Sequence, residues 1–216
     1  MKTQILIAAS ITLCWNVPTA CQAVNVEPDD FPNGTNISNA FPGVTLSDIT
    51  GGGGAVNPVL SLTSPVASTG TRVFGRFDQQ TSWGNGSWDF LRIDITGATS
   101  SASLDFIADD SDSNPVLAAY NSAGILLTSS TLPGTFAVGT VVPLTVSAPN
   151  IATVLALGDP PPGSFGTIAQ ITAITSGGPN NWVVDNFRYE RVPEPATIAL
   201  VALGTLAATA WRRRRS

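Results

Sequence analysis

The stretch Leu91-Arg92-Ile93-Asp94-Ile95-Thr96 alternates apolar and polar residues along its whole length. Because successive side chains of a β-strand point to opposite faces, this pattern predicts a strand with one face buried and one face in water. The stretch Ser103-Leu104-Asp105-Phe106 repeats the alternation. Further short strand-like runs lie at residues 72–77, 116–120, 125–128, 141–146, 151–157, 167–174 and 182–189.

Turn-forming sequences such as Ser113-Asn114-Pro115 and Pro133-Gly134 separate these runs. Many short strands at close spacing, without a sustained helical period, favour an antiparallel β-sandwich or jelly roll. We therefore predict an all-β fold, with a sandwich domain at residues 59–191 and a looser N-terminal segment of the same body at 24–58. One more strand is expected within that segment, around Val44-Thr45-Leu46.

The 216-residue chain contains no histidine, and only 12% of its residues are charged. Without histidine there is no Ser–His or Cys–His nucleophile pair and no His-ligated zinc. Residues 24–192 hold five basic against fourteen acidic residues, so this part of the chain has a net charge of −9. Nucleic acids bind to basic surfaces, and the acidic body therefore argues against a nucleic-acid partner.

The N-terminus has the layout of a secretory signal peptide over residues 1–23. One positive charge at Lys2 precedes an apolar run from Ile5 to Trp15, and small residues lead to Ala23. That run is too short to span a membrane as a helix. Cleavage after Ala23 would remove both cysteines and leave a mature body without thiols. Cys21 allows an alternative, a lipoprotein-type site at which Cys21 is lipidated.

The C-terminus combines three features in a fixed order. These are Val192, Pro193, Glu194 and Pro195, then an uncharged stretch at 196–211, then Arg212, Arg213, Arg214 and Arg215. As a helix, the uncharged stretch would be roughly 24 Å long, close to the thickness of a bilayer core, and we predict that it spans the membrane. By the positive-inside rule, the arginines stay in the cytoplasm and the body lies outside.

This order resembles the PEP-CTERM sorting signal of Gram-negative bacteria, which here corresponds to residues 192–216. The resemblance implies that the protein is exported and is held for a time in the inner membrane by its C-terminal helix. It implies processing by an exosortase-type enzyme, followed by a place at the cell surface or in an extracellular matrix with exopolysaccharide or biofilm. The segment 183–190 is similar to the last strand of the body in such proteins.

An acidic turn is the candidate metal site. Asp110, Asp112 and Asn114 alternate as the first ligands of an EF-hand calcium loop do. Pro115 stands where that loop needs glycine, and Asn121 stands where it needs a bidentate glutamate, so an EF-hand is excluded. Two interpretations stay open: a calcium site shared between loops of the sandwich, and a solvated turn that binds nothing.

Trp83, Trp88 and Asp89 surround the turn Gly84-Asn85-Gly86-Ser87 and form a candidate glycan contact. An exposed aromatic ring offers a face on which the C–H groups of a sugar stack, and a neighbouring carboxylate accepts hydrogen bonds from its hydroxyl groups. The alternative is that these tryptophans pack in the core or at a strand edge, as buried tryptophan commonly does.

Catalysis has little support, because the body has no histidine or lysine to act as a base for its serines and threonines. Many carboxylate pairs could in principle form a glycosidase site, and the sequence singles out none of them. We predict a non-enzymatic exported protein without a cofactor, with calcium as the one candidate ion. The alternative is a carbohydrate-binding module that recognises matrix glycan, with or without calcium. The third interpretation is a secreted hydrolase that uses an Asp/Glu pair.

Overall fold

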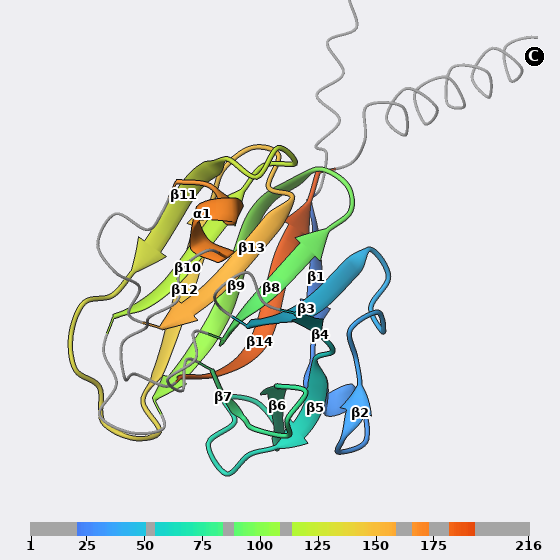
Figure 1. Cartoon of the computed structure of the whole chain (residues 1–216), viewed down its shortest axis with the longest axis vertical. Helices are drawn as coiled ribbons and strands as arrows, with labels where there is room; N and C mark the ends of the chain where they lie inside the picture. The colour runs from blue at the N-terminus through green and yellow to red at the C-terminus, as the bar shows by residue number, and fades with distance from the viewer. Residues whose placement is uncertain are drawn as a thin grey trace, which may run out of the picture.

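The computed structural model describes residues 21–50, 55–83, 89–108, 114–158, 166–172 and 182–192. These residues form two antiparallel sheets, sheet A and sheet B, which pack face to face (Figure 1). Two stacked antiparallel sheets are a β-sandwich, and the predicted fold class of the body is confirmed. Residues 1–20 of the predicted leader and the whole predicted membrane helix at 196–211 lie outside the described residues. The last two residues of the predicted leader, Gln22 and Ala23, form the start of strand β1.

Sheet A has the strand order β12-β9-β14-β6-β5-β2, and β1 and β7 also pair with β14. Its strands are β1 (Gln22–Val26), β2 (Thr35–Asn36), β5 (Leu60–Thr63), β6 (Arg72–Gly75), β7 (Ser82–Trp83), β9 (Thr99–Ala108), β12 (Val141–Ser147) and β14 (Trp182–Arg191). The strand predicted at 182–189 is therefore confirmed, and it is central. β9 lies on one side of β14, while β7, β6 and β1 follow one another along the other side.

Sheet B has the strand order β11-β10-β13-β8-β3-β4. Its strands are β3 (Val44–Thr50), β4 (Val56–Asn57), β8 (Asp89–Ile95), β10 (Pro115–Tyr120), β11 (Leu126–Thr131) and β13 (Thr153–Gly158). In β8, Leu91, Ile93 and Ile95 are buried, whereas Arg92 and Asp94 are only partly covered. The alternation of apolar and polar residues in this strand therefore correctly predicts which side chains point into the core and which point outward.

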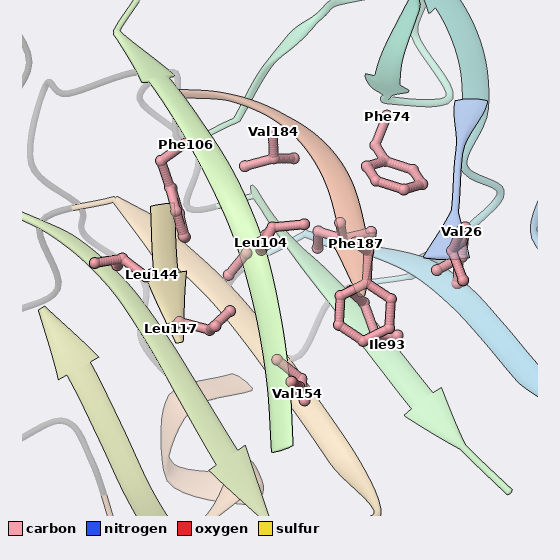
Figure 2. Packing of buried hydrophobic residues seen from close by; sticks show 14 of the residues in the cluster. Val26, Phe74, Ile93, Leu104, Phe106, Leu117, Leu144, Val154, Val184 and Phe187 are labelled. Carbon is pink, nitrogen blue, oxygen red and sulfur yellow. The ribbon is translucent and has the colours of Figure 1, made fainter. Parts of the chain in front are cut away.

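The main core lies between the two sheets, and Figure 2 shows side chains from both of them meeting there. Leu104 and Phe187 enter from sheet A, and Ile93, Leu117 and Val154 enter from sheet B (Figure 2). Burying one such side chain completely contributes about 1.5–3 kcal/mol to folding. The core thus derives from the apolar positions of many short strands that lie far apart in the sequence.

Sheet B also buries its second face. Val116, Tyr120, Leu155 and Leu157 form part of a separate apolar cluster there, against which Ile168 of the short helix α1 (Ile168–Thr172) packs. This explains why β10 and β13 are apolar at almost every position, whereas β12 alternates between exposed and buried residues. A strand that is buried on both faces has no need for alternation.

The strand predicted at 167–174 is wrong, because residues 168–172 of that run form α1. The local reason is a capping box. The backbone N–H of Gln170 donates to Thr167 Oγ1 at 3.2 Å, and the backbone N–H of Thr167 donates to Gln170 Oε1 at 2.7 Å. These two hydrogen bonds satisfy donors at the first turn that would otherwise lack a partner, and they favour a helical start over an extended chain.

The N-terminal segment contributes more strands to the two sheets than the predicted loose region would. β1 joins sheet A, η1 (Pro28–Asp30) is a short 3-10 turn, and β3 pairs with β8 over its full seven residues. The expected strand around Val44-Thr45-Leu46 is therefore longer than the sequence suggested. Among the residues that the structure describes, no helix is both long and apolar enough to cross a membrane.

Candidate functional site

The predicted sorting segment follows directly on the central strand of sheet A. At the end of β14, Arg191 lies opposite Gln22 of β1 on one side and Thr99 of β9 on the other. The backbone N–H of Val192 donates to the carbonyl of Ala98 at 2.8 Å, so the fold holds the chain as far as the first residue of the predicted motif. Residues 193–195 and 212–215, which carry the rest of the motif, lie outside the described residues.

The start of β1 and the end of β14 therefore lie together at one end of the sandwich, which we call the terminal end (Figure 1). The guanidinium of Arg191 also binds there, donating to the carbonyls of Pro42 and Thr96 at 3.4 Å each. It lies 5.8 Å from the ring centroid of Tyr189. These contacts fix the last residues of the folded body next to the predicted sorting segment.

The opposite end of β14 is where both candidate binding loops begin. Trp182 pairs with Trp83 of β7 on one side and with Ala108 of β9 on the other. Residues 84–88 therefore follow the end of β7, and residues 109–113 follow the end of β9, on the two sides of β14. We call this the loop end. It lies at the far end of β14 from the sorting segment.

The structure does not support Trp83 and Asp89 as glycan contacts. Trp83 is only 2% exposed, and its indole N–H donates to the carbonyl of Phe74 at 2.8 Å. Asp89 is 3% exposed and forms an ion pair with Arg76. A ring in the core has no free face for a sugar, so the alternative of core packing is correct for Trp83. Trp88 lies outside the described residues.

The candidate calcium ligands are described only in part. Asn114 has a left-handed backbone with φ of 50°, while Asp110 and Asp112 lie outside the described residues. Within the described part of the chain, no group of three or more acidic or cysteine side chains is arranged to hold a metal ion. That finding does not test the predicted calcium site, because Asp110 and Asp112, two of its three ligands, lie outside the described residues.

Sequence reasoning missed a buried ion pair that joins the two sheets at the loop end. Arg76 follows β6 of sheet A, and its guanidinium binds the carboxylate of Asp89, the first residue of β8 in sheet B. The same guanidinium lies 3.1 Å from Asp78 and donates to Gln80 at 3.3 Å. Arg76 and Asp89 are both buried, so each gives up hydration when the pair forms a close contact between the sheets.

Asp48 of β3 lies beside this ion pair and is fully buried. One of its carboxylate oxygens accepts a hydrogen bond of 3.4 Å from the backbone N–H of Phe77. Burial raises the pKa of Asp48 to about 6, with further upward contributions from Asp89 and Asp78 that Arg76 partly offsets. Asp48 therefore titrates close to neutral pH in the folded protein.

A third buried carboxylate, Asp185 of β14, fixes a loop on the outer face of sheet A. Its Oδ2 accepts hydrogen bonds from the backbone N–H groups of Ser68 and Thr69 at 3.0 and 3.1 Å, and from the Ser68 hydroxyl at 2.9 Å. The N–H of Asn186 donates to its other oxygen at 2.8 Å. Burial raises the pKa of Asp185, and these hydrogen bonds counteract the rise.

A bulge in β14 places the neighbours of Asp185. The pairing with β9 shifts between Asp185 and Arg188, and Asn186 adopts a left-handed φ of 53° there. Its side-chain amide donates to Asp105, which lies directly opposite Asp185, at 2.9 Å. Asp105 and Asp185 are therefore a pair of adjacent carboxylates. Asp185 is fully buried beneath the loop of Ser68, which favours a structural role for it over a role in hydrolysis.

The comparisons with known proteins agree with the C-terminal prediction. The PEP-CTERM protein-sorting motif matches residues 191–215, which confirms the sorting signal and implies an exported chain that an exosortase-type enzyme processes at its C-terminus. No curated protein matches this sequence. A solved structure described as the K2 cleaved adhesin domain of Lys-gingipain is similar with a TM-score of 0.45 and 12% identity, over 78% of this chain and 99% of that chain. A likeness at that level says nothing about a shared ligand.

Proposed function

We propose that this chain, which carries the PEP-CTERM sorting motif at its C-terminus, is a non-enzymatic structural protein of the cell surface or extracellular matrix. The observation that carries the proposal is the motif at residues 191–215, which begins at the last residue of a folded β-sandwich. The sandwich is the cargo, and the motif directs its sorting. The proposal includes association with exopolysaccharide or biofilm matrix, which the resemblance to other proteins with this motif supports.

The proposed sorting route uses the two predicted terminal segments. A leader at residues 1–23 starts export, and the helix at 196–211 holds the chain in the inner membrane with Arg212–Arg215 in the cytoplasm. Because β1 begins and β14 ends at the terminal end, both membrane-directed segments would leave the body on one side. The loop end would then point away from the membrane until the tail is removed.

Replacing Glu194 by alanine is expected to abolish C-terminal processing, because the motif that the processing enzyme recognises then loses its only carboxylate. Intact-mass spectrometry of the protein from the producing cell measures this. The parent should lack the leader and the arginine tail, whereas Glu194→Ala should retain the tail. The matched control is Glu190→Ala, which removes an exposed carboxylate four residues earlier and should be processed like the parent. An arginine tail on the mature parent protein would contradict the proposal.

A glycan-binding module is the second candidate. The observation that favours it is that residues 84–88 and 109–113 both begin at the loop end, after the strands β7 and β9 that flank β14. Trp88 would then supply the ring for a sugar, and Asp110, Asp112 and Asn114 would hold calcium beside it. A secreted hydrolase is the third candidate, and the burial of Asp185 does not favour it.

Calcium binding provides the test of this second candidate. Titration calorimetry of the parent should show binding, with a dissociation constant of about 10⁻⁴–10⁻³ M as in other extracellular modules. The double variant Asp110→Asn, Asp112→Asn should bind no calcium, while Asp30→Asn, at an exposed position elsewhere, should bind like the parent. A glycan array with and without calcium then asks whether the ion supports sugar binding. Absence of heat from the parent at millimolar calcium would remove the site.

A further inference from the structure

Four neighbouring elements of the described body carry no charged residue. From Ser113 to Gly158 the sequence contains no charged residue, and this stretch supplies β10, β11, β12 and β13. The charged residues of the described body belong to the other strands and their turns. Figure 1 shows β11 at one edge of the molecule and β1, β2 and β5 toward the other. Among the described residues, an otherwise acidic body thus has four consecutive uncharged strands, β10 to β13.

The outermost part of this stretch consists of residues 125–147, which we call the uncharged flank. It contains β11, β12 and their connection, and the two strands contact each other where the edges of sheets A and B meet. Among the described residues there are seven exposed large hydrophobic side chains, and four lie on this flank. They are Ile125, Leu132, Val138 and Val141. Phe136, from the same connection, packs edge-on against Trp182 at 5.7 Å, which anchors the connection on the core.

The strand edges of the sandwich differ in how they are protected. In sheet A, β2 is only two residues long and β12 carries Pro143 at its middle. In sheet B, β4 is also two residues long. Short edge strands and proline prevent pairing with another strand. β11 has neither protection, because it has six residues and contains no proline and no charge.

Most of β11 is available for pairing in the described part of the chain. Along its edge away from β10, the described residues pair with its backbone only at its beginning, through the bridge between Ile125 and Thr167 and the N–H of Leu126 that donates to Gly166 at 3.2 Å. β12 of the other sheet contacts β11 but does not pair with it. Thr128 to Thr131 have only β10 as a described strand partner. An uncharged, unprotected edge of this kind is a template for another β-strand.

We propose that the uncharged flank is a self-association surface, where β11 of one copy pairs antiparallel with β11 of a second copy about a twofold axis. The charge distribution selects a second copy as the partner. Two bodies with a net charge of −9 repel each other on most approaches, and like charges that face each other across an interface are costly. The uncharged flank brings no charge to the contact. A twofold axis presents the same edge and the same exposed aliphatic side chains to each partner.

The test measures self-association of the full chain in a mild detergent by sedimentation velocity. The parent should dimerise, and Ser129→Lys or Ser129→Glu, each at an exposed position of β11, should raise the dissociation constant at least about tenfold. An equimolar mixture of these two variants should associate again, because opposite charges then face each other, and this recovery shows that both variants fold. The control is Val56→Lys, on the exposed edge strand β4 of the same sheet, which should dimerise like the parent.

Three results would overturn the proposal. The first is a parent that stays monomeric, including one that binds polysaccharide as a monomer. The second is a Val56→Lys variant that is weakened as much as Ser129→Lys, because association would then depend on overall charge rather than on β11. The third is a mixture of the lysine and glutamate variants that does not recover association.

Discussion

Replacing Arg76 by methionine is expected to lower the free energy of unfolding by about 3–5 kcal/mol, because it leaves a buried carboxylate without its counter-charge. Arg76 is 5% exposed and Asp89 is 3% exposed, so water cannot solvate the carboxylate that remains. Asp48, which is also buried, would at the same time lose the positive charge of Arg76, which lowers its pKa. Denaturant unfolding measures the loss, and the buried Trp83 and Trp182 provide a fluorescence signal for it.

The matched control is Arg92→Met, which removes an arginine from a surface ion pair. Arg92 binds Asp94 at 2.8 Å, and the two side chains are 32% and 35% exposed. Water replaces much of that interaction, so the expected loss is below about 1 kcal/mol. The double variant Arg76→Met, Asp89→Leu should recover part of the stability, because it removes the unpaired charge as well. Equal losses for Arg76→Met and Arg92→Met would show that the buried pair has no special weight.

The strands with one buried face could be predicted from the sequence. In β8 and β12 the side chains alternate between core and surface, and the period of two in their residues follows from that geometry. β10 and β13 were also found, although they are buried on both faces and lack the alternation. Their strand assignment rested on short apolar runs between turn residues, which is a weaker signal than a period.

The helix α1 shows where that weaker signal fails. Residues 167–174 are a short run with apolar residues between turns, as β13 is, and they were predicted as a strand for the same reason. The distinguishing feature was the spacing of Thr167 and Gln170, whose reciprocal hydrogen bonds start the helix. Composition alone cannot separate a short buried strand from a short helix, whereas a capping pair can.

The sorting signal could be predicted from the sequence and the buried polar groups could not, for a physical reason. The signal is linear, so all of its chemistry lies within residues 191–215 and is visible in the sequence. Arg76 follows a strand of sheet A, whereas Asp89 and Asp48 belong to strands of sheet B, and no local pattern links them. The error at Trp83 has the same origin, since its burial depends on the pairing of β7 with β14.

Replacing Asp48 by asparagine is expected to stabilise the protein at pH 7.5 by about 2–3 kcal/mol and to change little at pH 4. The carboxyl has a pKa of about 6 in the folded protein, against an ordinary value of 3.8. Below about pH 4 it is protonated in both the folded and the unfolded chain, so it adds no penalty. Between pH 4 and 6 the unfolded chain loses the proton more readily, and stability falls as pH rises. Above pH 6 the whole penalty is present.

Asparagine keeps the acceptor for the Phe77 N–H but cannot ionise, so Asp48→Asn should lack the fall in stability between pH 4 and 6. Denaturant unfolding at pH 4, 5.5 and 7.5 measures this, and Asp30→Asn is the control because its side chain is exposed and should leave the pH profile as in the parent. If Asp48→Asn is instead less stable at pH 7.5, the ionised carboxylate must gain more from Arg76 than it loses by burial. In that case Arg76 would be a partner shared by Asp48 and Asp89, and the two substitutions Arg76→Met and Asp48→Asn would not be additive.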